Sequence, residues 1–168
     1  LCETVIHDEA QAPPHALGTC FAYLVENNIL NDLVSLCLPD EPLGILDEFL
    51  RMCTTLVRHI HVPWFLANEG VAHALLQLLR SCNKKQQKPP GLVELVYALC
   101  ARIHQQPDTL RVLVQLGAQL PKERPADRFP LMTCIVRHIT MNGPPGRHMR
   151  TSLVWVMHAL LTLGTNPV

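Results

Sequence analysis

The 168-residue sequence predicts an all-α fold, and three of its features support this prediction. Leu, Val and Ile dominate an apolar fraction of 48%, whereas aromatic residues supply only 5%, a balance that favours helices packed on helices over strands. Proline and glycine punctuate the chain and leave segments of helical length between them. Within these segments, apolar residues recur with the 3.6-residue period of an amphipathic helix.

The N-terminal part of the chain predicts four helices separated by proline or asparagine pairs. The clearest is the segment 43–61, in which Leu46, Phe49, Leu50 and Cys53 share one face and charged residues fall between them. Asn27-Asn28 predicts a helix end or a tight bend, and Pro63 ends the fourth helix. We predict helices at 1–10, 16–27, 29–38 and 43–61.

The C-terminal part predicts five more helices, with strong apolar periodicity at 69–82 and 92–106. Asp108 is a candidate cap for a shorter helix. The run 142–146, Asn-Gly-Pro-Pro-Gly, predicts the sharpest turn of the chain. Polar and proline-bearing segments near 83–90 and 118–128 predict flexible joints. The predicted helices lie at 69–82, 92–106, 108–116, 129–141 and 147–163.

About eight or nine helices with short joints favour a single domain over 1–168 of the armadillo/HEAT-like α-solenoid class. No strict repeat motif recurs, so the repeats are predicted to be divergent, and a globular helical bundle is the alternative. The first residues resemble the middle of a helix, and the last follow an apolar helix. We therefore expect a fragment of a longer solenoid.

The balance of charges argues against nucleic acid as a partner. Fourteen Lys and Arg face fourteen Asp and Glu, and a neutral chain is a poor general phosphate binder. The apolar stretch 154–163 contains His158 and is too short to span a bilayer. We expect a cytoplasmic protein without a membrane-spanning segment.

The seven cysteines are predicted to be reduced core residues, because their number is odd, no CxxC pair occurs and most lie in apolar runs. They are Cys2, Cys20, Cys37, Cys53, Cys82, Cys100 and Cys134.

No motif in the sequence predicts catalysis, and we expect no enzyme activity, cofactor or metal. The segments HExxH, GxSxG and GxxxxGK[ST] are all absent. His59 and His61 are spaced i, i+2 near Cys53, which places the two rings on nearly opposite sides of a helix. His138 and His158 are predicted to be surface or packing residues. An enzyme or metal protein whose site is assembled only in three dimensions is the competing hypothesis.

Two groups of residues are candidates for partner contacts. Lys84, Lys85 and Lys88 predict a solvated basic loop, or a contact with an acidic partner or membrane surface. The tryptophans Trp64 and Trp155 predict buried anchors or, if exposed, interface hot spots.

Five segments share a recognisable pattern of apolar spacing and turn residues. They are GTCFAYLVENNILNDLVSL, EPLGILDEFLRMCTTLVRHIHVPWF, VAHALLQLLRSC, LVELVYALCARIHQQPDTLRVLV and, less closely, FPLMTCIVRHITMNGPPGRHMRTSLVWVMHALL. In the second, Pro42 and Gly44 precede a helix that Pro63 follows. With this pattern the chain resembles the N-terminal region of the FTS- and Hook-interacting protein family, also called retinoic-acid-induced-16-like.

The resemblance implies a non-catalytic adaptor built as a helical solenoid. Such an adaptor joins Hook and FTS proteins in a complex that links dynein–dynactin to early endosomes, in some members by contact with an endosomal Rab GTPase. It implies no catalytic residue, and it assigns no partner-binding residue to this chain. An armadillo-like scaffold of an unrelated intracellular complex is the alternative.

Overall fold

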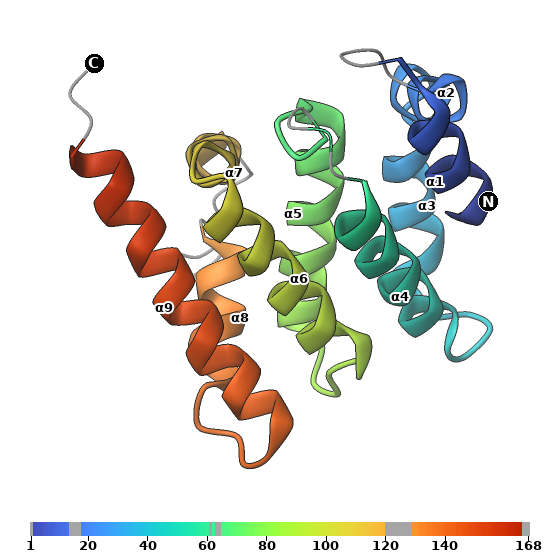
Figure 1. The fold of residues 1–168 in the computed structure, drawn as a ribbon. Helices are drawn as coiled ribbons and strands as arrows, with labels where there is room; N and C mark the ends of the chain where they lie inside the picture. The colour runs from blue at the N-terminus through green and yellow to red at the C-terminus, as the bar shows by residue number, and fades with distance from the viewer. Residues whose placement is uncertain (1, 14–17, 61, 63–64, 120–128, 166–168) are drawn as a thin grey trace.

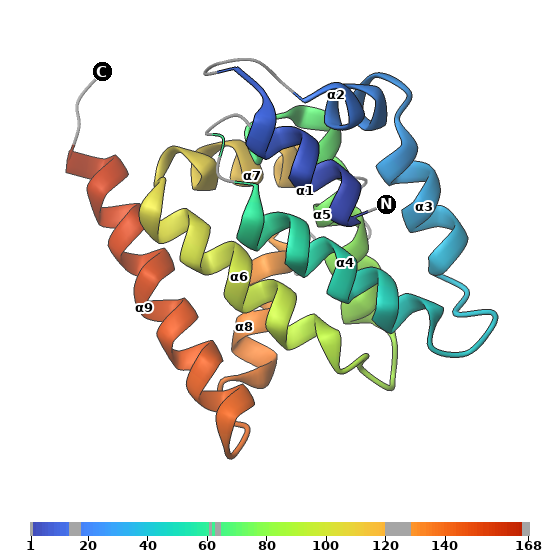
Figure 2. The ribbon, with the colours of Figure 1, turned by 45° about the vertical axis from the view of Figure 1, so that its right-hand side comes forward.

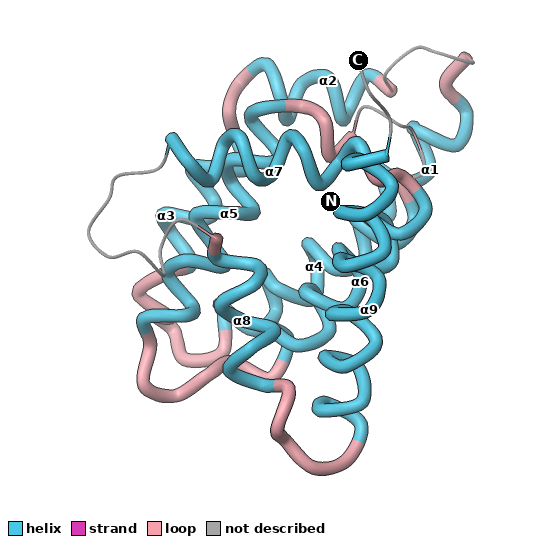
Figure 3. Tube along the Cα trace, turned by 90° about the vertical axis from the view of Figure 1, so that its left-hand side faces the viewer, coloured by secondary structure: helices cyan, strands magenta, loops and turns pink. Residues whose placement is uncertain are grey.

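The structure is a computed structural model that describes residues 2–13, 18–60, 62, 65–119 and 129–165. Within these ranges the chain forms nine α-helices and no strand (Figures 1 and 3), which confirms the all-α prediction. The helices are α1 (Cys2–Gln11), α2 (Thr19–Glu26), α3 (Ile29–Cys37), α4 (Ile45–His59), α5 (Glu69–Lys84), α6 (Gly91–Gln105), α7 (Asp108–Gln119), α8 (Pro130–His138) and α9 (Pro144–Thr165).

The structure confirms one predicted helix boundary and differs from the prediction at others. Asn27 caps the C-terminus of α2 and Asn28 adopts the left-handed conformation, as expected of a tight bend. Helix α7 continues to Gln119, three residues beyond its predicted end, and 120–128 of the second predicted joint lie outside the described residues. Asp108 is the first residue of α7 and not the residue before it, so its carboxylate lies in the first turn.

The largest correction concerns the start of α9. The prediction placed 144–146 in a turn, but the helix begins at Pro144. Proline is well tolerated at the first positions of a helix, because the N–H it lacks would have no intrahelical partner there. The turn itself is made by the residues before Pro144, where Gly143 has a φ of 78°.

The helices pack in two rows. In one row α1 contacts α4, α4 contacts α6, and α6 contacts α9. In the other, α3 contacts α5 and α5 contacts α8, while α2 and α7 lie along one edge (Figures 1 and 2). The chain alternates between the rows, so each new helix covers the apolar face left by an earlier one. Helix α9 lies at one end of the molecule, and the helices α1 to α3 lie at the opposite end.

A continuous apolar core lies between the rows, and α6 is its most buried helix. Leu92, Leu95, Val96 and Ile103 of α6 are fully enclosed. Fully burying a side chain of this size stabilises a fold by about 1.5–3 kcal/mol. The first residue of α6, Gly91, lies so close to α4 that a Cβ there would be 3.1 Å from the Cβ of Leu50.

Carboxylates hold several helix starts in place. The Asp40 carboxylate accepts hydrogen bonds from the backbone N–H groups of Gly44 and Leu46, at 3.0 and 3.1 Å, where α4 begins. The Asp8 carboxylate of α1 accepts from the N–H of Cys20 at 2.7 Å, at the start of α2. Such bonds satisfy donors that have no partner within the helix, and each contributes about 1 kcal/mol.

We predict that Gly146→Ala destabilises the fold by about 1–3 kcal/mol or more, because a Cβ at Gly146 would lie 1.7 Å from the backbone oxygen of Met141. Gly164→Ala is the matched control on the same helix, since a Cβ at Gly164 meets nothing within 4 Å. The control should remain within about 1 kcal/mol of the wild type. Urea unfolding measures both, and equal stabilities of the two variants would contradict the close approach at the α8–α9 turn.

Candidate interaction surface

A row of five rings runs along the seam between α6 and α9. Tyr97 and His104 lie two turns apart on α6, so they share one face of that helix. His148 and Trp155 have the same spacing on α9, and His158 follows one turn later. Rings from α9 and α6 alternate along the seam in the order His148, Tyr97, Trp155, His104, His158. We call these five residues the ring row.

The rings of the row are in direct contact. Tyr97 stacks on His148 with ring centroids 4.4 Å apart and meets Trp155 at 5.1 Å. His104 stacks on Trp155 at 5.7 Å and meets His158 edge-on at 5.3 Å. Aromatic pairs at such distances contribute about 0.5–1.5 kcal/mol beyond the area that they bury. Tyr97 and Trp155 are half-buried, so part of each ring remains accessible to a partner.

Glu94 extends the ring row onto a third helix. One oxygen of its carboxylate accepts from the Arg58 guanidinium of α4 at 2.7 Å, and the other lies 3.3 Å from Nδ1 of His148. The Glu94 and Arg58 side chains are both about half exposed, so solvent screens the pair and it contributes at most about 1 kcal/mol. A continuous polar and aromatic strip therefore crosses α4, α6 and α9.

The sequence identified only part of this surface. It singled out Trp155 and His158, but it did not link either to Tyr97, His104 or Glu94. The i, i+7 spacing of the two ring pairs was a usable signal for a shared helix face. The contact between α6 and α9, however, required tertiary structure. Trp64 and His61 lie outside the described residues.

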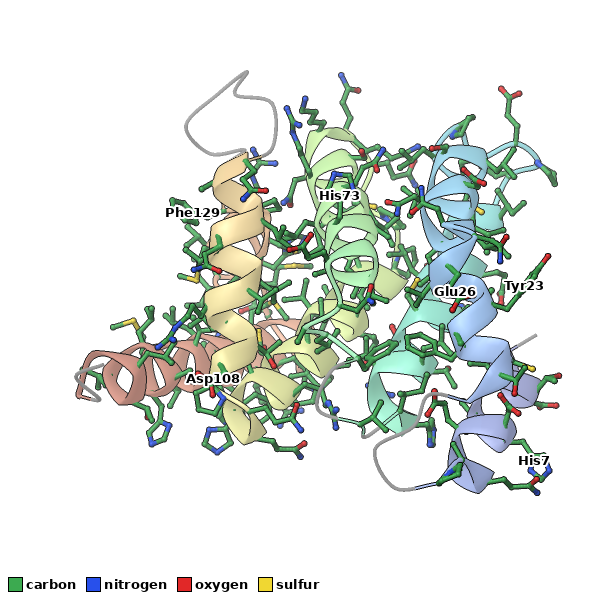
Figure 4. The ribbon with its side chains drawn as sticks, turned by 90° about the horizontal axis from the view of Figure 1, so that it is seen from above. His7, Tyr23, Glu26, His73, Asp108 and Phe129 are labelled. Atoms are coloured by element: carbon green, nitrogen blue, oxygen red, sulfur yellow. The ribbon has the colours of Figure 1, made fainter. Side chains whose placement is uncertain are left out.

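The described residues bring together no three His, Cys, Asp or Glu side chains that could hold a metal ion. His59 is exposed whereas Cys53 is buried, so the two do not converge. His138 is a buried packing residue whose Nδ1 lies 2.7 Å from the backbone oxygen of Cys134. Seen from above, His7, His73 and Asp108 lie on separate helices and far from one another (Figure 4).

The seven cysteines are free, as predicted, and five of them are buried. Burial raises the pKa of the Cys82 thiol to about 11 and the pKa values of Cys100 and Cys134 to about 12. Burial also raises the pKa of Cys53, more strongly still. Because the thiolate is the reactive form, these cysteines are poor nucleophiles at neutral pH.

The basic loop differs from the prediction at Lys88. Its ammonium group donates to the backbone oxygens of Cys82 and Asn83, at 3.0 and 2.7 Å, and to that of Lys85. The Arg137 guanidinium of α8 also donates to the Asn83 oxygen. Burial and the neighbouring Arg137 charge lower the pKa of Lys88. Lys88 therefore caps the C-terminus of α5, and the prediction of a solvated cluster is wrong for this residue.

The chain matches the family model of the retinoic acid induced 16-like proteins over residues 20–162. It belongs to this family. No curated protein and no solved structure matches the chain. The match confirms the resemblance seen in the sequence, and it takes in α8 and α9, where the likeness was weaker. In the described part of this RAI16-like chain, no helix combines the length and the apolar character needed to cross a bilayer.

We predict that Tyr97 and Trp155 are energetically coupled across the seam. In a double-mutant cycle with Tyr97→Leu and Trp155→Leu, the coupling energy should be about 0.5–1.5 kcal/mol, because leucine keeps an apolar side chain at each position but removes the ring contact. Chemical unfolding of the wild type, both single variants and the double variant gives this energy. Strict additivity of the two substitutions would show that the rings are neighbours without mutual stabilisation.

We predict that the protein loses stability at alkaline pH. The buried thiols have raised pKa values, so in the folded state they remain protonated above pH 9, whereas in the unfolded chain they ionise at about pH 8.5. Stability is therefore full below about pH 8 and falls as pH rises, by up to about 1.4 kcal/mol per pH unit for each thiol. Urea titrations between pH 7 and pH 10 measure this slope.

The control for this pH dependence is Cys100→Ala, which removes one buried thiol. Its free energy of unfolding should start lower, because a sulfur is lost from the core, but should fall less steeply with pH. An identical slope in the two proteins would mean that Cys100 does not carry the pH dependence.

Proposed function

We propose that this chain is part of a non-catalytic adaptor that works by presenting a helical surface to partner proteins. The observation that carries the proposal is the ring row. Tyrosine, tryptophan and arginine are the residues most enriched at interface hot spots, and Tyr97, Trp155 and Arg58 lie along one partly exposed strip. The scattered titratable groups and the raised pKa values of the buried thiols favour binding over catalysis.

The arrangement of the helices suits this role. We interpret the two rows as successive divergent repeats of an armadillo- or HEAT-like solenoid, in which each repeat contacts its neighbours along the stack. A solenoid offers a long, rigid surface formed by equivalent helices. The strip across α4, α6 and α9 follows one such row.

Membership of the RAI16-like family supports a specific set of partners. The proposed adaptor joins Hook and FTS proteins and links dynein–dynactin to early endosomes. We also expect it to contact an endosomal Rab GTPase. It acts in the cytoplasm, and its association with the endosomal membrane is peripheral and runs through these partners. In this proposal no nucleic acid, cofactor or metal takes part.

Affinity purification of the full-length protein from cells tests the proposal. Hook and FTS proteins should be recovered with the wild type, and Trp155→Ala should reduce their recovery at least about tenfold, the effect of losing one hot-spot residue. Leu36→Ala is the control, because Leu36 is 68% exposed on α3, outside the strip. Circular dichroism verifies that both variants remain folded.

Two results would contradict the proposal in different ways. A clean purification without Hook or FTS proteins would overturn the assigned partners and favour a scaffold of another complex. Recovery that is equal with Trp155→Ala and with the wild type would keep the partners but exclude the ring row as their binding surface.

A further inference from the structure

The turn between α8 and α9 contains an asparagine that is followed by a glycine. Asn142 and Gly143 lie in this turn, which projects from the lower edge of the molecule in Figure 1. Among the asparagines of the sequence, Asn142 alone precedes a glycine. Every residue from Thr140 to Pro144 is exposed, so water reaches the whole turn.

Two neighbouring groups in this turn are free to react with each other. In the described part of the chain, no hydrogen bond engages the side-chain amide of Asn142 or the backbone N–H of Gly143. The Gly143 oxygen accepts the Arg147 N–H at 3.2 Å, as the first bond of α9, but this leaves the Gly143 nitrogen unused. Gly143 also lacks a Cβ, so no side chain of its own shields that nitrogen from the Asn142 amide.

We propose that Asn142 is a site of spontaneous deamidation. The Gly143 nitrogen loses its proton to hydroxide and attacks Cγ of Asn142. A C–N bond forms, the side-chain nitrogen leaves as ammonia, and a five-membered succinimide results. Water then opens this ring at either of its two carbonyl carbons, so the products are aspartate and isoaspartate at position 142. The reaction needs only the turn and water, so the inference does not depend on the proposed Hook and FTS complex.

The other described asparagines are held by hydrogen bonds of their side chains. The Asn68 side chain accepts the N–H of Val71 at 3.2 Å at the start of α5. Asn83 is buried and donates to the backbone oxygen of Pro130 at 2.8 Å. The same holds for Asn27, Asn28 and Asn31. Since none of these residues precedes a glycine, they are matched references within the same chain.

Aspartate at position 142 should be tolerated by the turn. It places a carboxylate just before the first residue of α9, Pro144, at the positive end of the helix dipole. The first turn of α9 contains no acidic residue, and the exposed Arg147 lies nearby in sequence, so the new charge meets no described like charge there.

Isoaspartate should disturb the turn. In this product the main chain runs through the former side chain, so the backbone between residues 142 and 143 gains one methylene group. The backbone is tightly packed at this turn, because a Cβ at Gly146 would lie 1.7 Å from the oxygen of Met141. A longer main chain shifts these two residues relative to each other, and the start of α9 is loosened.

Peptide mapping by mass spectrometry tests this inference on the folded full-length protein during incubation at neutral pH. The peptide that contains Asn142 should gain about 1 Da, because an amide becomes an acid. Its rate should exceed that of every other described asparagine at least about tenfold, since only Asn142 precedes a residue without a Cβ. The rate should rise at mildly alkaline pH, because hydroxide removes the Gly143 proton.

Asn142→Gln is the control variant, because glutamine keeps the amide but would have to form a larger ring. An isoaspartate-specific methyltransferase should transfer methyl groups from S-adenosylmethionine to the aged wild type but not to this variant. Two results would overturn the site: a mass gain at Asn142 no faster than at the reference asparagines, or a gain that occurs only after unfolding in urea.

Urea unfolding tests the effect on the fold. The fraction that contains isoaspartate should unfold at a lower urea concentration than fresh protein, whereas Asn142→Asp should unfold at the same or a higher concentration. Equal midpoints for the isoaspartate fraction and fresh protein would show that the longer backbone does not loosen α9.

Discussion

The architecture depends on how closely α6 approaches α4. At Gly91 the backbone of α6 comes near enough to Leu50 that a side chain would crowd the contact, and the Asp47 carboxylate accepts the Gly91 N–H at 2.6 Å. This close approach and this hydrogen bond hold the start of α6 against α4. Because α6 is buried along most of its length, its position in turn sets where α9 can lie. The position of the α6–α9 seam, which carries the ring row, therefore depends on how α4 packs against α6.

Small side chains make the second crossing possible. Ser152 and Ala159 are completely buried on the inner face of α9, which lets its backbone come close to α6, while the rings occupy the margin of the contact. Because small side chains fill the middle of the α6–α9 contact, the large rings lie at its edge and remain partly exposed. The strip is thus polar and aromatic for a structural reason, and the same partly exposed rings are the basis of the proposal that it binds proteins.

The sequence predicted the helices well because apolar period and proline placement are local signals. It placed Ile29–Cys37 and Gly91–Gln105 to within one residue at each end. It misjudged Pro144 because proline breaks a helix interior but suits a helix start, and the composition of the run does not distinguish the two. It also misjudged Lys88, whose bonds to the α5 carbonyls depend on how the chain folds back. The candidate surface was predictable only in parts, since its contacts join residues of α4, α6 and α9 that lie far apart in sequence.

The charges are separated along the chain: residues 1–50 contain nine Asp and Glu and no Lys or Arg, whereas residues 51–168 contain fourteen Lys and Arg and only five Asp and Glu. This separation affects how the molecule approaches others. A protein with an acidic end and a basic end turns in the field of any charged body that it approaches, so its ends arrive in a preferred order even when its total charge is zero. Orientation during diffusion costs no contact energy and weakens with ionic strength. Although its net charge is zero, the molecule is therefore oriented by electrostatic forces before it makes contact with a charged surface.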